Sequence, residues 1–166
     1  GIEPSAILGF RDEYPNLVAP VLKSKAESLA QNVFTIEEFI AHEMRATNID
    51  VSKFTTASKT VYYHGHCHQK ALSSTSYAIT SLGIPTNFNV QTIDAGCCGM
   101  AGSFGYEKEH YDLSQQIGED RLFPALRAID SSAIVAASGT SCRHQIKDGV
   151  NKTALHPIEV LYNALN

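Results

Sequence analysis

Residues 60–90 read TVYYHGHCHQKALSSTSYAITSLGIPTNFNV, and this stretch is the strongest indication of the fold class. Its first four residues are β-branched or aromatic, which is typical of a strand. A helical stretch follows over residues 69–82 and ends at Gly83, and residues 86–93 alternate around Phe88 and Val90 as a second strand. Two strands joined by a helix predict a β-α-β unit with parallel strands.

The remainder of the chain continues this alternation. Residues 94–105 form a glycine-rich loop, and a long helical stretch follows over residues 106–127 with a break expected at Pro124. Next come a wholly apolar strand over residues 133–137 and a short helix over residues 142–147. A brief strand over residues 153–155 follows, and then a helix that Pro157 opens. The pattern predicts a three-layer α/β fold, with a parallel sheet of about four strands and helices on both faces.

The first third of the chain is predicted to be helical. Residues 17–32 show apolar positions at helical spacing, and a second helix begins at Thr35, where Glu38 completes a capping box. This second helix should end near residues 47–48, and residues 48–58 are polar enough to be a connection.

Composition excludes several classes of protein. The chain has 166 residues, of which 43% are hydrophobic and 18% charged, so it can form one domain with an ordinary core. Its formal net charge of −4 argues against nucleic acid as a partner. No apolar run approaches the ~20 residues of a membrane helix, and the first residues do not resemble a secretion signal, so we expect a cytoplasmic protein.

The four cysteines carry most of the functional information. Cys97 and Cys98 are adjacent, which makes a disulfide framework a poor interpretation, while Cys67 and Cys142 each follow a predicted strand. Because the carboxyl ends of parallel strands meet at one edge of a sheet, we expect all four thiols to converge there. Thiolates select iron–sulfur clusters, zinc or copper(I), and Gly99 lets the backbone approach such a group closely. A single cysteine of this kind, such as Cys142 taken alone, is as often a small buried apolar residue.

Histidines surround the first cysteine. His64, His66 and His68 alternate about Cys67, so together they suit a zinc site. The simpler interpretation is that His64 and His68 orient the loop by hydrogen bonds to backbone or carboxylate groups, which leaves His66 as the candidate ligand. His156 also falls at a predicted strand end and is expected to support the ligands from behind.

Other catalytic signatures are missing. We find no dinucleotide-binding or phosphate-binding glycine motif and no nucleophile elbow. A hydrolase built on Cys67 and a neighbouring histidine would leave the adjacent cysteine pair unexplained.

Residues 64–72, 94–106 and 139–143 resemble the cysteine-rich CCG domain found in heterodisulfide reductase and in the glycolate oxidase iron–sulfur subunit. The form that they resemble most lies at the C-terminus of FAD-linked oxidases of the D-lactate dehydrogenase type. The resemblance extends over nearly the whole chain, with residues 1–58 as a helical part that includes the tail of a preceding repeat and residues 59–166 as a complete repeat.

The resemblance implies electron transfer. In such oxidases an FAD domain oxidises a 2-hydroxy acid such as D-lactate or glycolate, and iron–sulfur centres pass the electrons to a quinone, a cytochrome or a disulfide. It implies a cluster, of the [4Fe–4S] type, on Cys67, Cys97, Cys98 and Cys142. The alternative is a zinc-binding structural module that docks on a flavin domain without a redox role. FAD and its domain would be partners outside this sequence, so we expect no dehydrogenase turnover from the chain alone. Those partners could also attach the protein to the inner membrane, which is the alternative to a cytoplasmic location.

Two positions depart from the family pattern. Gly139 stands where the first cysteine of a Cys-x-x-Cys motif is usual, and Ala6 stands where a Pro-Ser-Cys motif has its cysteine. If the two repeats are related by pseudosymmetry, Ala6 corresponds to Cys142. We therefore expect Ala6 at the start of a helix, facing Cys67 and Cys98, and expect Ala6→Cys to raise the iron that the chain retains.

Overall fold

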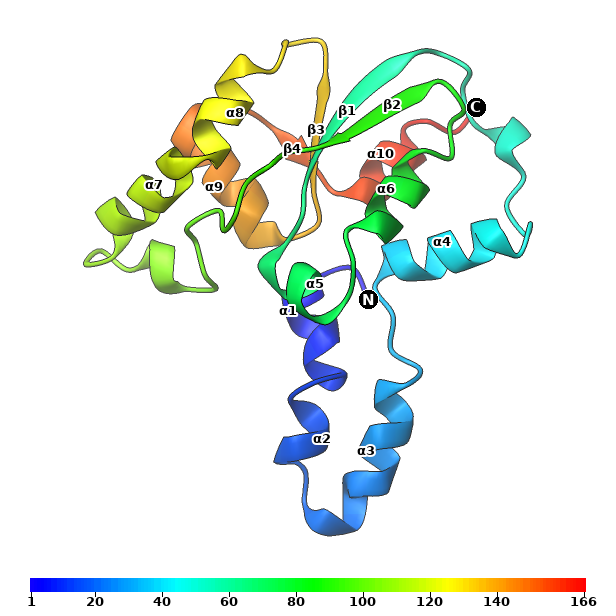
Figure 1. Cartoon of the computed structure of the whole chain (residues 1–166), viewed down its shortest axis with the longest axis vertical. Coiled ribbons are helices and arrows are strands. Elements are labelled where there is room, and N and C mark those ends of the chain that lie inside the picture. Colours follow the sequence, from blue (N-terminus) through cyan, green and yellow to red (C-terminus); the bar gives the residue numbers. More distant parts are fainter.

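A computed structural model describes residues 1–166 and contains a single sheet of four parallel strands in the order β2-β1-β3-β4. The strands are β1 (Lys59–His64), β2 (Phe88–Thr92), β3 (Ile134–Ala137) and β4 (Ala154–Leu155). Figure 1 shows helices around this sheet, and the predicted three-layer α/β fold with a parallel four-stranded sheet is confirmed.

Helices cover the two faces of the sheet. The helices on one side are α4 (Ile36–Arg45), α6 (Ser76–Leu82) and α10 (Pro157–Tyr162), and those on the other are α7 (Tyr111–Asp120), α8 (Leu122–Ala128) and α9 (Thr140–Val150). Neighbouring residues of β3 point to opposite sides, since Val135 packs with Phe123 and Ile146 while Ala136 packs with Leu82. Both faces of the central strands are therefore buried, as a parallel sheet requires.

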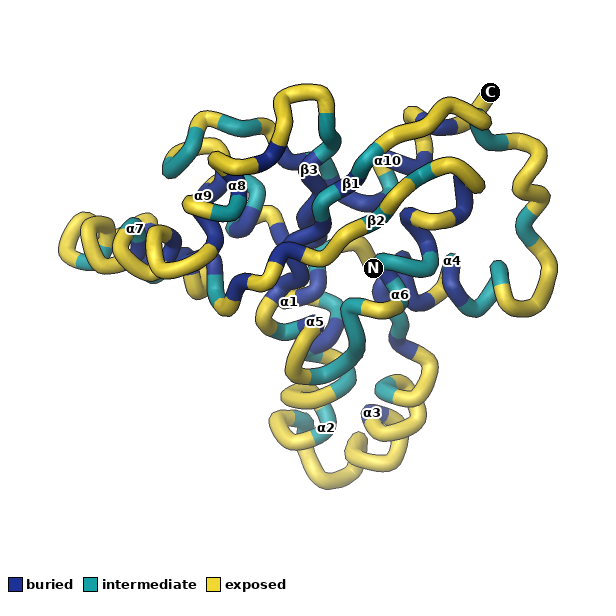
Figure 2. The backbone as a smooth tube through the Cα atoms, turned by 45° about the horizontal axis from the view of Figure 1, so that its top comes forward, coloured by how far each residue is buried: buried dark blue, intermediate teal, exposed yellow.

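The N-terminal helices form an arm. It contains α1 (Pro4–Ile7), α2 (Tyr14–Leu17) and α3 (Lys23–Ala30), with short 3-10 turns at Leu8–Phe10 and Pro20–Leu22. Figure 1 shows the arm projecting at the end of the sheet where β1 leads into α5 (Cys67–Leu72), and Figure 2 shows that α2 and α3 are mostly exposed. Two further 3-10 turns lie at Val51–Lys53 and Phe104–Tyr106.

The single helix predicted over residues 17–32 is wrong, because the chain breaks before Pro20. Val18 and Ala19 have extended backbone with ψ of 156° and 145°, as the residue before a proline prefers. The predicted start of the next helix is confirmed, since the Thr35 hydroxyl accepts from the Glu38 backbone N–H and the Glu38 carboxylate accepts from that of Thr35.

Two other predicted helices are each divided. Residues 69–82 are interrupted at Ser73, whose backbone leaves the helical conformation with φ of −150° and ψ of −142°. The Ser73 hydroxyl donates to the buried Glu38 carboxylate. Residues 106–127 begin as a 3-10 turn and break at Arg121 rather than at Pro124. Pro124 lies in the first turn of α8, where a backbone N–H has no helical acceptor and proline costs little.

None of the helices is long and apolar enough to cross a lipid bilayer.

Candidate metal centre

A cavity of about 430 Å³ opens where the first three strands end. All four cysteines line it, and all four are free thiols. Its other lining residues are Ser5, His66, His68, Ala101, Gly102 and Ser141. We call it the cysteine cavity. Segments that follow β1, β2 and β3 thus deliver thiols to one place, and the role of those thiols as ligands stays a prediction.

The four thiols lie close enough together to shift one another's pKa values. The contact with Cys97 raises the pKa of Cys67, and the contact with Cys142 raises the pKa of Cys98. The same contacts lower the pKa values of Cys97 and Cys142. Four sulfur donors are therefore held in close contact, which is a donor set suited to a soft metal.

The loop that carries Cys97 and Cys98 is fixed from two sides. The Lys70 ammonium on α5 donates to the carbonyls of Ala95 at 2.6 Å and Gly96 at 3.1 Å. These bonds tie the loop to the helix that begins at Cys67.

Gly99 fixes the other side of this loop. It has φ of +100°, and a β-carbon there would lie 2.1 Å from the Ser114 carbonyl oxygen. Its backbone N–H donates to the Cys97 sulfur at 3.3 Å. Gly99 therefore stands behind a predicted ligand, at a place where no other residue fits without movement.

The turn that precedes Cys142 is held by two charged side chains. Arg143 donates to the backbone carbonyls of Ala137 at 2.9 Å and Ser138 at 2.7 Å. The Glu3 carboxylate accepts from the Thr140 backbone N–H at 2.8 Å. Burial raises the pKa of Glu3, but hydrogen bonds from Thr140 and from Ser5 outweigh it and lower the pKa overall. The N-terminal segment is thereby anchored at the first turn of α9, beside the cavity.

His66 caps α5 with its ring. The Nδ1 atom accepts from the His68 backbone N–H at 3.2 Å, so the neutral ring carries its proton on Nε2. With Nδ1 occupied and Nε2 protonated, His66 is better suited to donate a hydrogen bond at the cavity wall than to bind a metal. The His68 ring stacks on that of His66 and also lines the cavity. A β-carbon at Gly139 would lie 2.2 Å from the His66 ring, so His66 occupies the room that a cysteine at Gly139 would need.

His64 lies deeper than the other two histidines of the motif. It is fully buried, and neither ring nitrogen has a hydrogen-bond partner, so the expected bond to a backbone or carboxylate group is absent. One ring nitrogen and the sulfurs of Cys98 and Cys142 all lie within 4.8 Å of one another. Strand alternation gives the reason, because Tyr62 and His64 point to the face that holds these two cysteines, while Tyr63 points to the other.

His156 lies outside the cysteine cavity. It is buried at the start of α10, where Nδ1 accepts from the Ile158 backbone N–H at 3.1 Å and Nε2 donates to the Ile2 carbonyl at 2.8 Å. Burial lowers its pKa. His156 thus holds the segment that carries Glu3 and Ser5. It also lies 3.7 Å from the Glu37 carboxylate, which accepts from Ser138 in the turn before Cys142.

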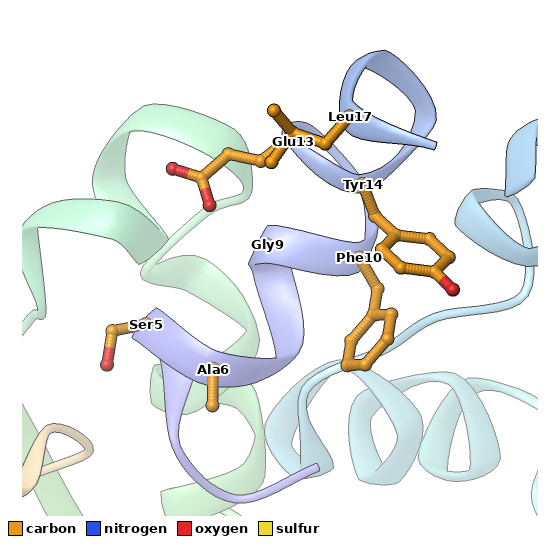
Figure 3. Close-up of a pocket in the computed structure, with 7 residues that line it drawn as sticks. All are labelled: Ser5, Ala6, Gly9, Phe10, Glu13, Tyr14 and Leu17. Atoms are coloured by element: carbon orange, nitrogen blue, oxygen red, sulfur yellow. The ribbon is translucent and has the colours of Figure 1, made fainter. Parts of the chain in front are cut away.

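The structure separates Ala6 from the thiols. Ala6 lies within a short helix, α1, that begins at Pro4 and ends at Ile7. Ser5 lines the cysteine cavity and Ala6 does not. Ala6 lines a second groove, of about 200 Å³, together with Ser5, Phe10 and Tyr14. Figure 3 shows the Ser5 and Ala6 side chains pointing in different directions. The expectation that Ala6 faces the cysteines is therefore wrong, because the helix turns the neighbouring Ser5 toward them.

Together these features describe a parallel α/β domain with a thiol-rich candidate metal site at the carboxyl edge of its sheet, where ligands bind in open sheets.

The sequence is similar to several known proteins. The chain is 34% identical over 107 residues to a subunit of the anaerobic glycerol-3-phosphate dehydrogenase of Escherichia coli (strain K12), covering 63% of this chain and 26% of that protein. It is 26% identical over 162 residues to D-2-hydroxyglutarate dehydrogenase of the same strain, covering 97% of this chain and 15% of that protein. It is also 26% identical over 173 residues to lactate utilization protein A of an Exiguobacterium species, covering 99% of this chain and 65% of that protein.

The chain thus spans about a quarter or less of the first two relatives. No family model matches it. No solved structure matches it either.

Proposed function

We propose that this chain is an iron–sulfur electron-transfer domain of the CCG type, within an FAD-linked oxidoreductase that acts on 2-hydroxy acids. The observation that carries the proposal is the convergence of four free thiols on one cavity. Four cysteine thiolates are the usual ligand set of an iron–sulfur cluster. We assign residues 59–166 to one complete repeat and residues 1–58 to a helical part with the tail of a preceding one.

The names of the relatives support a redox role. Two are dehydrogenases or dehydrogenase subunits, and the third is a lactate utilization protein. Because the chain spans only a small part of the dehydrogenases, we place FAD and the hydroxy acid on a partner domain. The electron acceptor would be a quinone, a cytochrome or a disulfide, and the location cytoplasmic or, through partners, at the inner membrane.

The residues present fit a cluster. The donor set is soft, and the two lowered pKa values favour thiolates at Cys97 and Cys142. When bound, a cluster supplies one-electron transfer. The chain's own residues hold the thiols in register, and the backbone N–H of Gly99 donates to the Cys97 sulfur. Hydrogen bonds to sulfur are one of the means by which proteins set a cluster's potential.

The arm offers a surface for the partner domain. It exposes large apolar side chains, with 78% of Leu17 and 84% of Val21 accessible. Leu17 shares a groove with Ser5, which also lines the cysteine cavity. Exposed apolar residues gathered in this way are typical of interaction sites. We propose that the flavin domain docks beside the cavity.

Zinc in a structural module without redox role is the second candidate. The sulfurs of Cys98 and Cys142 lie within 4.8 Å of each other, and two thiolates on one tetrahedral zinc ion are separated by about 3.8 Å, since each Zn–S bond is about 2.3 Å. This spacing suits a single ion.

Reversible reduction tests the proposed function. The chain is reconstituted with iron and sulfide without air, reduced with chemically reduced FMN and then reoxidised with a soluble quinone. We expect its visible absorbance to bleach and return, and expect Cys142→Ala to lose this response. A chain that binds no iron and sulfide, or whose absorbance does not respond to reduced FMN, would contradict the proposal.

A further inference from the structure

We propose that His64 is a direct nitrogen ligand of the metal centre, at its buried end beside Cys98 and Cys142. The inference rests on the proposed function only in assuming that the cysteine cavity binds metal. It adds a donor of a different kind to the four thiols.

The three donor atoms already lie near the positions that one metal atom requires. All three are within 4.8 Å of one another. Around a tetrahedral ion, with Zn–S bonds of about 2.3 Å and Zn–N bonds of about 2.0 Å, sulfur and nitrogen are separated by about 3.5 Å. Side-chain movements of about 1 Å are therefore enough to bring His64, Cys98 and Cys142 onto one metal.

The unpaired ring of His64 is the independent observation. The side chain is completely buried, and both Nδ1 and Nε2 lack a hydrogen-bond partner. A buried polar group without a partner destabilises the folded state. A bond from one ring nitrogen to a metal would satisfy it and would explain why a polar side chain is placed there.

The other histidines of the motif are committed elsewhere. The Nδ1 atom of His66 caps α5, and His68 is half-buried at the outer wall of the cavity. The two deepest thiols, Cys98 and Cys142, are 2% and 1% exposed, so they share the surroundings of His64 rather than those of His66. The buried end of the site thus has two sulfur donors and one nitrogen donor, and Cys97 and Cys67 continue it outward.

Binding of Co²⁺, a coloured probe that accepts the same donors, tests this assignment in the reduced, metal-free whole chain. We compare wild type with His64→Leu, which fills the space without a donor, and His64→Cys, which restores one. His42→Ala serves as a control because His42 lies on α4, packed against Phe34 and Tyr77 and outside the cavity. Circular dichroism establishes that each variant is folded.

We expect His64→Leu to weaken Co²⁺ binding at least 10-fold, since even loss of a group behind a ligand costs about 10-fold to 100-fold. His64→Cys should retain binding and gain sulfur-to-cobalt absorption, and His42→Ala should match wild type. Co²⁺ binding by His64→Leu with wild-type affinity and spectrum would overturn the inference.

A second measurement covers the case in which His64→Leu does not fold. Wild-type chain loaded with Co²⁺ is prepared with natural and with ¹⁵N-labelled histidine, and pulsed EPR should show a nitrogen coupling that changes with the label. An unchanged coupling would overturn the inference. Iron and sulfide content, measured on the same preparations, tests the proposed function separately: if wild type retains neither while Co²⁺ binding depends on His64, the proposed function fails and the ligand assignment stands.

Discussion

Three glycines of the glycine-rich loop over residues 94–105, which carries Cys97 and Cys98, make a graded test of how this loop is built. Gly96 has neither a positive φ nor any atom within 4 Å of an added β-carbon, and Gly102 has φ of +70° but open space. Gly99 has both constraints, with φ of +100° and an added β-carbon at 2.1 Å from the Ser114 carbonyl oxygen and 2.9 Å from Gln145 Nε2. Alanine at each position therefore separates the cost of a positive φ from the cost of a steric clash at the added β-carbon.

The expected losses of stability follow from these geometries. Gly96→Ala should be nearly neutral, and Gly102→Ala should cost about 1 kcal/mol for the left-handed backbone. Gly99→Ala should cost about 3 kcal/mol or more, because a carbonyl oxygen at that distance forces the backbone to move. For a chain of this size, about 3 kcal/mol corresponds to a fall of about 6–12 °C in the melting temperature.

Thermal denaturation followed by circular dichroism measures the series, and metal analysis follows its effect on the site. We expect the order Gly96→Ala, Gly102→Ala, Gly99→Ala in falling stability, with metal lost chiefly from the last, since Gly99 follows the cysteine pair directly. If Gly99→Ala melts no lower than Gly102→Ala, the close packing of this loop on Ser114 is wrong.

Two further predictions concern the N-terminal part. Ser5→Cys should raise the iron that the chain retains while Ala6→Cys does not, because Ser5 lines the cysteine cavity and Ala6 does not; equal gains from both variants would contradict the placement of α1. Burial raises the pKa of Glu38, but Arg11 and the other hydrogen-bond donors lower it more, so its folded pKa lies below the unfolded value of about 4.3. Ionised Glu38 therefore stabilises the fold above that value, and this stability is lost as pH falls through the folded pKa. In denaturant titrations from pH 6 to 3, the Glu38→Gln variant should lose less stability than wild type. Identical losses in the two proteins would refute this role.

Much of the fold was accessible from the sequence because the strand pattern is strong. The β-branched and aromatic run that begins at Thr60 and the apolar run that begins at Ala133 both became central strands. Helix breaks were harder to predict, because they depend on distant partners. Ser73 leaves its helix where its hydroxyl reaches Glu38 on another helix, and no local pattern contains that contact.

The site shows the same division. Strand-end logic placed the cysteines together, since it depends only on parallel topology. It did not distinguish the roles of the histidines, because helix capping and burial depend on hydrogen-bond partners and packing in the folded chain rather than on sequence spacing. Alternation along β1 did contain the information for His64: Tyr62 and His64 share a face, and that face is the one covered by the helix of Cys142.

Iron, zinc and acid-labile sulfide, measured in the chain purified without air, decide whether the four thiols hold a cluster. We predict iron and sulfide in roughly equal amounts, with both lost from the Cys142→Ala variant. Zinc at about one ion per chain, with no sulfide before or after reconstitution, would contradict the proposed iron–sulfur centre.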